Sequence, residues 1–97
     1  MKRGYWVSVY REIRNEEALA AYAALSGPAI AAGGGRFVAR GLPSHVFEDG
    51  LMERTVIIEF ASAQQAIDTY RSPAYQDAVK VLNGAVVREI RIIEEAI

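Results

Sequence analysis

A small set of side chains in this sequence could do chemistry, and most of them are arginines, glutamates and tyrosines. Arg40 and Glu59 lie in two predicted strands, and Trp6 lies in a third. A shielded carboxylate beside an arginine can hold a polar ligand, or act as an acid or base if burial raises its pKa. Arg40 and Glu59, framed by Trp6, are therefore the first candidate site. The alternative is that such charges pair across an interface and only set its register.

His45 is the single histidine of the chain and follows Pro43 in a predicted connection between strands. Histidine is the usual general base near neutral pH, so His45 joins Arg40 and Glu59 as a catalytic candidate. A lone histidine in a loop is more often a solvent-facing residue. The chain has no cysteine and no second histidine, so we expect no metal site and no cofactor.

Three tyrosines form a second candidate group, with Tyr22 in one predicted helical segment and Tyr70 and Tyr75 in another. Tyrosines at helical spacing either fill a core or line an apolar pocket with polar tips. Arg71, next to Tyr70, could anchor an anionic ligand or simply cap its helix. The candidate ligand-binding residues are therefore Trp6, Tyr22, Arg40, Glu59, Tyr70 and Tyr75.

Hydrophobic alternation indicates the elements that must position these side chains. It predicts strands over 5–10, 36–40, 53–60 and 86–94, with a short extra strand over 45–48. One helix is predicted from the N-cap Asn15 to the glycines 33–35, with a bend or restart at 27–28. These glycines follow a helix and lead into a strand, so they indicate a turn rather than a phosphate loop.

The second helical region begins at a capping box, in which Ser62 is followed by Gln65. Ser72 and Pro73 predict a restart within it, and Gly84 predicts its end. The resulting order is β-α-β-β-α-β over a single domain, 1–97. With right-handed crossovers, this order gives a ferredoxin-like α+β fold, a four-stranded antiparallel sheet with helices on one face.

Alternation also divides each strand into two faces. The more apolar face is predicted to pack under the helices: Tyr5, Val7, Val9, Phe37, Ala39, Val56, Ile58, Phe60, Val86, Arg88, Ile90 and Ile92. The other face would carry Trp6, Ser8, Tyr10, Arg36, Val38, Arg40, Thr55, Ile57, Glu59, Val87, Glu89, Arg91 and Ile93. It is too apolar for free solvation, so we expect a second copy to cover it, giving a homodimer through the sheet face opposite the helices.

Charge and hydropathy exclude several classes of protein. Eleven Lys and Arg against twelve Asp and Glu give a net charge of −1, which is atypical of a nucleic-acid binder. The longest alanine-rich run is too short to span a membrane, and the basic start is not followed by a secretory core. The sequence therefore predicts a cytoplasmic protein with neither nucleic acid nor membrane as partner.

Several short motifs resemble the domain of unknown function 1330 family over essentially the whole chain. They are 4–6 (GYW), 34–37 (GGRF), 40–41 (RG), 56–60 (VIIEF), 72–73 (SP) and 75–76 (YQ). The resemblance implies a dimeric α-β barrel, a group that includes cofactor-free monooxygenases, muconolactone isomerases and dye-decolourising peroxidases. It implies motif positions at Tyr5, Trp6, Arg36, Arg40, Glu59, Tyr70 and Tyr75. Thr69, Arg71, Ala74 and the pair 51–52 depart from the usual pattern, so a pocket near them would differ from that of relatives.

Three hypotheses of function follow. The first is a cofactor-free enzyme that acts on a small organic molecule by proton transfer or oxygenation. The second is a non-catalytic module that binds or senses a small ligand. The third is a purely structural dimer, in which the polar residues only stabilise the interface.

Overall fold

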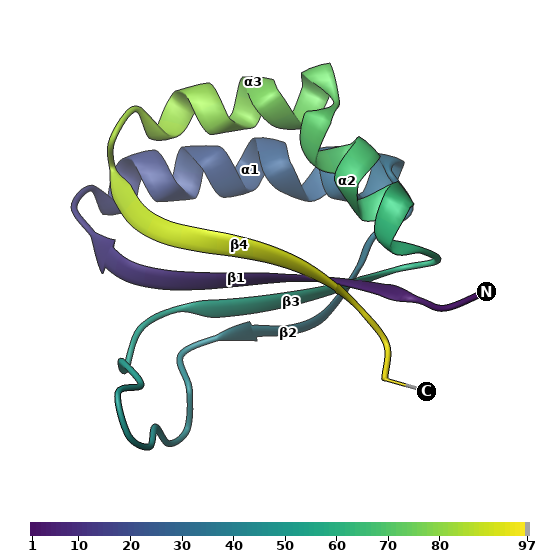
Figure 1. The fold of residues 1–97 in the computed structure, drawn as a ribbon. Coiled ribbons are helices and arrows are strands. Elements are labelled where there is room, and N and C mark those ends of the chain that lie inside the picture. Colours follow the sequence, from purple (N-terminus) through teal and green to yellow (C-terminus); the bar gives the residue numbers. More distant parts are fainter. Residues whose placement is uncertain (97) are drawn as a thin grey trace.

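The computed structural model describes residues 1–96. An antiparallel sheet of four strands carries all three helices on one face (Figure 1). The elements in chain order are β1 (Gly4–Ile13), α1 (Glu16–Ala32), β2 (Arg36–Gly41), β3 (Thr55–Phe60), α2 (Ala63–Arg71), α3 (Pro73–Leu82) and β4 (Val86–Glu94). The strand order is β2-β3-β1-β4, so β2 and β4 are the edges. The predicted ferredoxin-like β-α-β-β-α-β arrangement is confirmed, with its second helix divided into α2 and α3.

Helix starts lie where the capping residues predict them. The side chain of Asn15 accepts a hydrogen bond from the Ala18 amide at 3.1 Å, and Ser62 accepts one from the Gln65 amide at 3.1 Å. Ser72 ends α2 and caps α3. The predicted restart at Pro28 is not observed: α1 runs unbroken through it, and the residues it buries continue on both sides of the proline.

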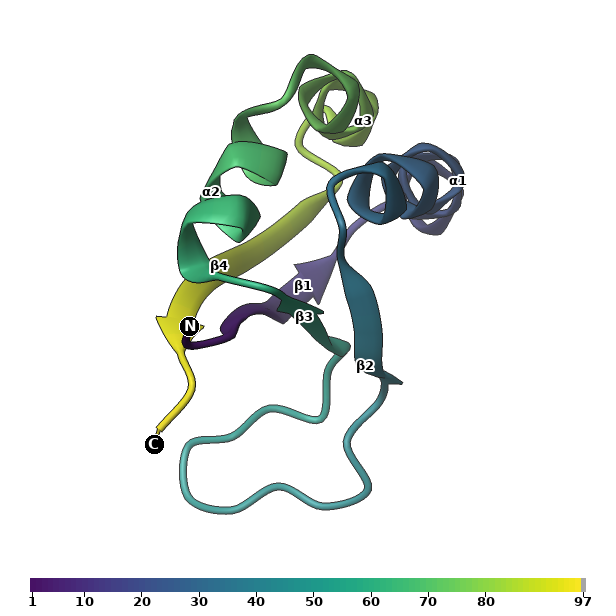
Figure 2. The same ribbon diagram turned by 90° about the vertical axis from the view of Figure 1, so that its right-hand side faces the viewer.

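The glycine triplet ends α1 in a turn, as predicted. Gly34 has φ of +90°, a conformation that only glycine adopts without strain. The side chain of Gln65 donates to the Gly33 carbonyl at 2.7 Å, so the end of α1 is tied to the start of α2. Figure 2 shows α2 and α3 above the β4 side of the sheet and α1 above its other side.

The β2–β3 connection, residues 42–54, contains no strand, so the predicted extra strand over 45–48 is wrong. A tight turn there places the Gly50 amide 2.9 Å from the Phe47 carbonyl. Figure 1 shows this segment projecting beyond the sheet on the side away from the helices. We call residues 42–54 the arm.

The predicted faces of β1 are reversed in the structure. Trp6, Ser8 and Tyr10 are buried against the helices, and they pair laterally with the helix-facing residues of β3 and β4. Val7 and Val9 therefore lie on the open face. Ser8 is tolerated inside because its Oγ accepts a hydrogen bond from the Trp6 indole at 2.9 Å. The predicted faces of β3 and β4 are correct.

An irregularity in β2 reverses part of that strand as well. Phe37 pairs with Ile58, but after a register shift Ala39 pairs with Ile57 and Arg40 with Val56. A bulge adds one residue and moves every later side chain to the opposite face. Arg40 therefore lies on the helix side and Ala39 on the open face, contrary to prediction.

Candidate functional site

Arg88 is the charged residue at the centre of the helix–sheet interface. It lies in the middle of β4, on the face under the helices. Its guanidinium donates to the hydroxyls of Tyr10 at 3.0 Å, Tyr22 at 3.1 Å and Tyr75 at 3.2 Å. No carboxylate of the described residues forms an ion pair with it. Arg88 is thus a half-buried cation whose hydrogen-bond partners among the described residues are neutral oxygens.

The tyrosines around Arg88 come from three elements: Tyr10 from β1, Tyr22 from α1 and Tyr75 from α3. The hydroxyls of Tyr22 and Tyr75 lie 2.6 Å apart. Burial would lower the pKa of Arg88, but the tyrosine oxygens outweigh it and the net pKa is raised. Burial, with Tyr22 beside it, raises the pKa of Tyr75 well above its ordinary value, against the opposing effect of Arg88. At neutral pH Arg88 is therefore charged and the Tyr75 hydroxyl keeps its proton.

A cleft of about 940 Å³ lies between α2, α3 and β4. It exists because α3 packs on α1 and stands off from the strands, whereas α2 packs on the sheet. The helix-facing residues of β4 form one wall, and the other lining residues come from α2, α3 and the turn after α3. The lining residues are Ile67, Tyr70, Arg71, Val79, Lys80, Leu82, Asn83, Gly84, Val86, Arg88, Ile90 and Ile92.

The lining of the cleft is mostly apolar and carries positive charge. Arg71, Lys80 and Arg88 are the charged side chains that line it, and no carboxylate is among the lining residues of the part described. A volume of this size accommodates a small organic molecule. The cleft therefore suits a ligand with an apolar body and an acidic group.

The predicted tyrosine group is divided between core and cleft. Tyr75 is fully buried, with its ring packed edge-on against Trp6 at a centroid distance of 4.8 Å. Tyr22 is buried as well. Tyr70 contacts the Trp6 ring at 5.6 Å and also lines the cleft beside Arg71. The structure thus brings Trp6, Tyr22 and Tyr70 together around the ring of Tyr75. Tyr22 and Tyr75 are in turn hydrogen-bonded to Arg88.

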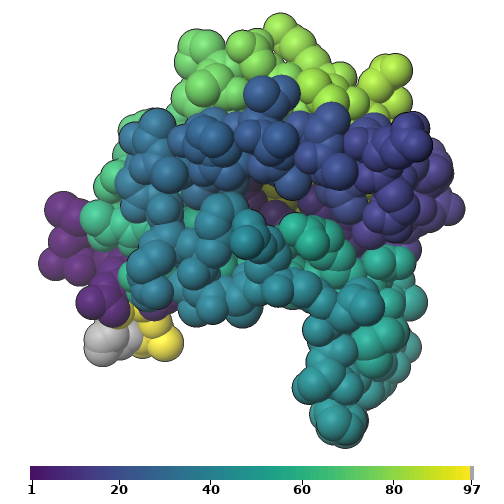
Figure 3. Space-filling model, turned by 180° about the vertical axis from the view of Figure 1, so that it is seen from behind, coloured from purple at the N-terminus to yellow at the C-terminus, as the bar shows by residue number. Residues whose placement is uncertain are grey.

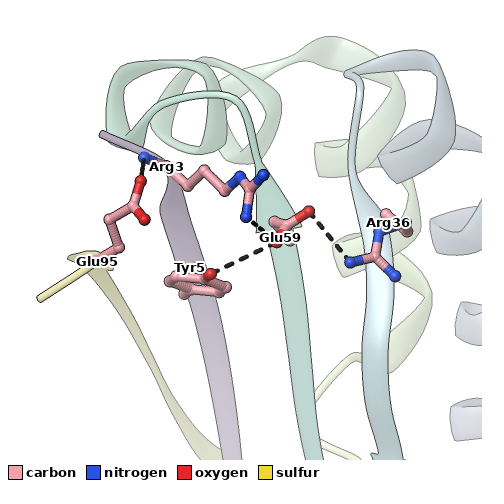
Figure 4. A network of polar contacts seen from close by, with 5 residues as sticks. All are labelled: Arg3, Tyr5, Arg36, Glu59 and Glu95. Atoms are coloured by element: carbon pink, nitrogen blue, oxygen red, sulfur yellow. Dashed lines mark hydrogen bonds and ion pairs between the residues drawn. The ribbon is translucent and has the colours of Figure 1, made fainter. Parts of the chain in front are cut away.

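The predicted proximity of Arg40 and Glu59 is wrong, because the two residues lie on opposite faces of the sheet. Glu59 is on the open face, where its carboxylate lies 3.2 Å from Arg36 and 3.8 Å from Arg3 (Figure 4). The Tyr5 hydroxyl donates to the same carboxylate at 3.4 Å. The glutamate is thus paired with arginines other than the one predicted, and Arg40 belongs to the helix side.

His45 lies in the arm, exposed, with Ser44 as its near polar neighbour at 3.4 Å. His45 lines neither the cleft nor a second, smaller cavity that lies between α1 and the sheet. Residues 1–96 contain no group of three or more His, Asp or Glu placed to hold a metal ion. No helix in the same residues is long and apolar enough to cross a membrane.

Arg88 is not among the residues that the sequence predicted to be functional, although its signal was present. Arg88 is the one charge in the predicted helix-facing set, which is otherwise apolar or aromatic. A long charged side chain at the centre of such a set is rarely buried without a partner. That position was therefore a stronger indication of a site than the charges on the opposite face.

The fold places this chain among ferredoxin-like α+β proteins. More specifically, it belongs to the family described as Domain of unknown function (DUF1330), whose sequence profile matches residues 3–96. No curated protein is similar enough to the chain to count as a match.

Solved structures share this fold. The RPA0582 protein of unknown function from Rhodopseudomonas palustris is 25% identical, with a TM-score of 0.76, covering 98% of this chain and 83% of its own. SnoaB, a cofactor-independent oxygenase from Streptomyces nogalater, is 13% identical with a TM-score of 0.63, covering 99% and 95%. A dimeric ferredoxin-like protein of unknown function from Thermobifida fusca is also 13% identical, with a TM-score of 0.63, covering 99% and 92%.

Proposed function

We propose that this protein binds a small, partly apolar organic anion, such as a carboxylate, in the cleft between α2, α3 and β4. The observation that carries the proposal is the half-buried guanidinium of Arg88, to which three tyrosine hydroxyls are hydrogen-bonded and which no described carboxylate neutralises. Withdrawing a cation from water is costly unless an opposite charge accompanies it. A ligand carboxylate can accept two parallel hydrogen bonds from one guanidinium.

The rest of the cleft supports the same ligand class. Val86, Ile90 and Ile92 lie on the same face of β4 as Arg88 and offer an apolar surface to the body of the ligand. Arg71 stands on the opposite wall, where it would add a second positive charge. Ligand pockets are commonly built in this way, with mostly apolar walls and a few polar groups that fix orientation.

Paired ligands test this proposal. Each of several aromatic and aliphatic carboxylates is compared with its uncharged primary amide, and the melting temperature is measured at equal ionic strength. We expect only the carboxylates to raise the melting temperature. At one hundred times its dissociation constant, a bound ligand adds about 2.7 kcal/mol to the free energy of unfolding. Arg71→Gln should weaken this response, whereas the matched variant Lys2→Gln at the exposed N-terminus should not. An equal response to acids and amides, or none to either, would refute the proposal.

A second candidate function is conversion of the same ligand without a cofactor. The cleft walls carry donors and cations but neither carboxylate nor imidazole in the described residues, so they would stabilise a developing oxyanion. In proton transfer the C–H bond next to a carbonyl breaks, the proton passes to solvent, and the electron pair moves to the carbonyl oxygen facing Arg88. NMR would detect exchange of that proton for deuterium in heavy water. Arg88→Lys should slow the exchange at least about a hundredfold, and equal rates would exclude Arg88 from the reaction.

We also propose that a second copy of the chain covers the open sheet face. That face exposes or half-exposes apolar side chains from all four strands: Val7, Val9, Val38, Ile57, Val87 and Ile93. The arm projects on the same side and carries further exposed apolar residues, with Phe47 80% exposed. Each such side chain contributes roughly 1.5–3 kcal/mol when buried, so a two-fold contact of these surfaces would be stable. A monomer by light scattering at micromolar concentration would contradict it.

A further inference from the structure

A second, smaller cavity lies between α1 and the sheet, apart from the cleft but sharing Arg88 with it as a wall. Its volume is about 30 Å³. Figure 3 shows a hollow on this side of the molecule, between α1 and the β2–β3 strands, with the purple and yellow of β1 and β4 in its depth. Its lining includes three arginines, Arg40, Arg54 and Arg88, together with Trp6, Tyr22 and Ser26. We call it the arginine cavity.

Three arginines converge on this cavity from different parts of the chain. Arg40 comes from β2, Arg54 immediately precedes β3, and Arg88 comes from β4. Arg54 and Arg88 flank the ring of Tyr10, with guanidinium carbons 5.9 and 5.5 Å from its centroid. Arg40 stacks on the Phe37 ring at 4.5 Å, at the exposed edge. The aromatic rings hold the guanidinium groups in place without neutralising them.

None of the three arginines is neutralised within the described chain. No ion pair involves them, because the glutamates nearest in the sheet are on the open face and pair there. The Nε of Arg54 is buried and has no hydrogen-bond partner among residues 1–96. An unsatisfied buried donor on a charged group costs more than one on a neutral group. An anion in the cavity would remove both penalties.

The size of the cavity limits the anion. One water molecule needs a cavity volume of about 10–15 Å³. A volume of 30 Å³ therefore admits a group with about two oxygen atoms. A carboxylate group or a comparably small oxyanion fits this limit, whereas an aromatic acid does not. Ser26 and Tyr22 add hydroxyl groups to the lining, so an oxyanion would receive neutral donors as well as charged ones.

We infer that the arginine cavity is a binding site for a carboxylate-sized oxyanion, held by Arg40, Arg54 and Arg88. The site is distinct from the cleft that holds the organic ligand of the proposed function. Because Arg88 is a wall of both, an anion in the cavity would also partly neutralise the charge that the cleft presents to its own ligand. Occupancy of the cavity should therefore weaken binding of organic anions in the cleft.

Trp6 makes the inference directly measurable, because it is the single tryptophan of the chain and it lines the cavity but not the cleft. Sodium formate, acetate and phosphate are titrated into the protein against sodium chloride at equal ionic strength. Trp6 fluorescence and the melting temperature are recorded together. We expect a saturable change in emission and a rise in melting temperature with formate or acetate, and neither with chloride. Phosphate, with four oxygens, tests the size limit: a response to phosphate alone would contradict a carboxylate-sized site.

Two variants and a matched control locate the site. Arg54→Gln should raise the dissociation constant of the oxyanion about tenfold or more, because the substitution removes a charged hydrogen-bond donor. Arg40→Gln, at an exposed position that disturbs packing less, should act in the same direction. Arg11→Gln makes the same charge change at an exposed position outside both pockets and should leave the titration unchanged.

The outcomes also distinguish this inference from the proposed function. If Arg71→Gln abolishes the fluorescence response while Arg54→Gln and Arg40→Gln retain it, the anion binds in the cleft and the arginine cavity is not a site. If none of the oxyanions differs from chloride, the inference is refuted, whereas organic acids would still be free to bind in the cleft. Loss of the response in Arg54→Gln and Arg40→Gln, with Arg71→Gln and Arg11→Gln unaffected, supports it.

Discussion

Replacing Tyr75 by phenylalanine removes one oxygen from the centre of the site and leaves the packing almost intact. The ring of Tyr75 keeps its edge-on contact with Trp6 at 4.8 Å. The lost hydroxyl lies 2.6 Å from that of Tyr22 and accepts a hydrogen bond from Arg88 at 3.2 Å. Its removal leaves two buried groups without that partner, at a cost of about 1–3 kcal/mol. We expect Tyr75→Phe to lower the free energy of unfolding by about 2 kcal/mol.

Tyr70→Phe is the matched control, since it deletes the same atom from a neighbouring tyrosine whose ring also contacts Trp6. Tyr70 is 36% exposed, so water can solvate its hydroxyl and the change in the free energy of unfolding should stay within about 0.5 kcal/mol. For a chain of this length, 2 kcal/mol corresponds to a fall in melting temperature of about 8–16 °C. Both variants are compared with the parent by thermal and urea unfolding at one protein concentration, because self-association would add to the apparent stability.

Equal costs for the two variants would refute the reasoning. They would mean that the contacts of Tyr75 with Tyr22 and Arg88 contribute nothing beyond what water supplies. A loss larger than about 4 kcal/mol would point instead to collapse of the packing around Trp6, and near-ultraviolet circular dichroism of that indole would show it.

Three further predictions follow from the same structure. Because burial raises the pKa of Tyr75 above its ordinary value near 10, stability should be full below about pH 10 and fall above it, and urea unfolding from pH 9 to 11 should show a smaller fall in Tyr75→Phe. Gly34→Ala should cost about 1–2 kcal/mol, because φ is +90° and a Cβ would clash with the Gln65 side chain. Gly27→Ala in the open middle of α1 should instead gain about 0.5–1 kcal/mol, and urea unfolding of both variants would compare their stabilities. Phe47→Ser in the arm should raise the dimer dissociation constant by tenfold or more without lowering monomer stability, and analytical ultracentrifugation would detect it; an unchanged constant would exclude this side chain from the interface.

Local sequence signals were sufficient to predict most of the fold. Capping residues placed the start of α1 and the division between α2 and α3, and the glycines at 33–35 placed the turn into β2. These signals depend on neighbours within four residues, so they can be read without knowledge of the tertiary structure. The alternation in β3 and β4 was equally clear, because only one face of each strand is apolar enough to be buried.

Local signals could not predict which face of β1 and which part of β2 pack against the helices. Both faces of β1 are apolar or aromatic, and the buried one contains Ser8, which looks polar until its hydrogen bond with the Trp6 indole is known. In β2, a single extra residue reversed Arg40. That reversal separated Arg40 from Glu59 and placed Arg40 on the helix side of the sheet.

The sequence by itself determined the order of the elements, the fold class and the presence of one charge in a buried row. Only the tertiary structure decided that Arg88 meets the hydroxyls of Tyr10, Tyr22 and Tyr75, and that no described carboxylate accompanies it. The physical reason is one of range. Capping and alternation are properties of adjacent residues, whereas the neutralisation of a buried charge depends on side chains that the fold brings together from distant parts of the chain.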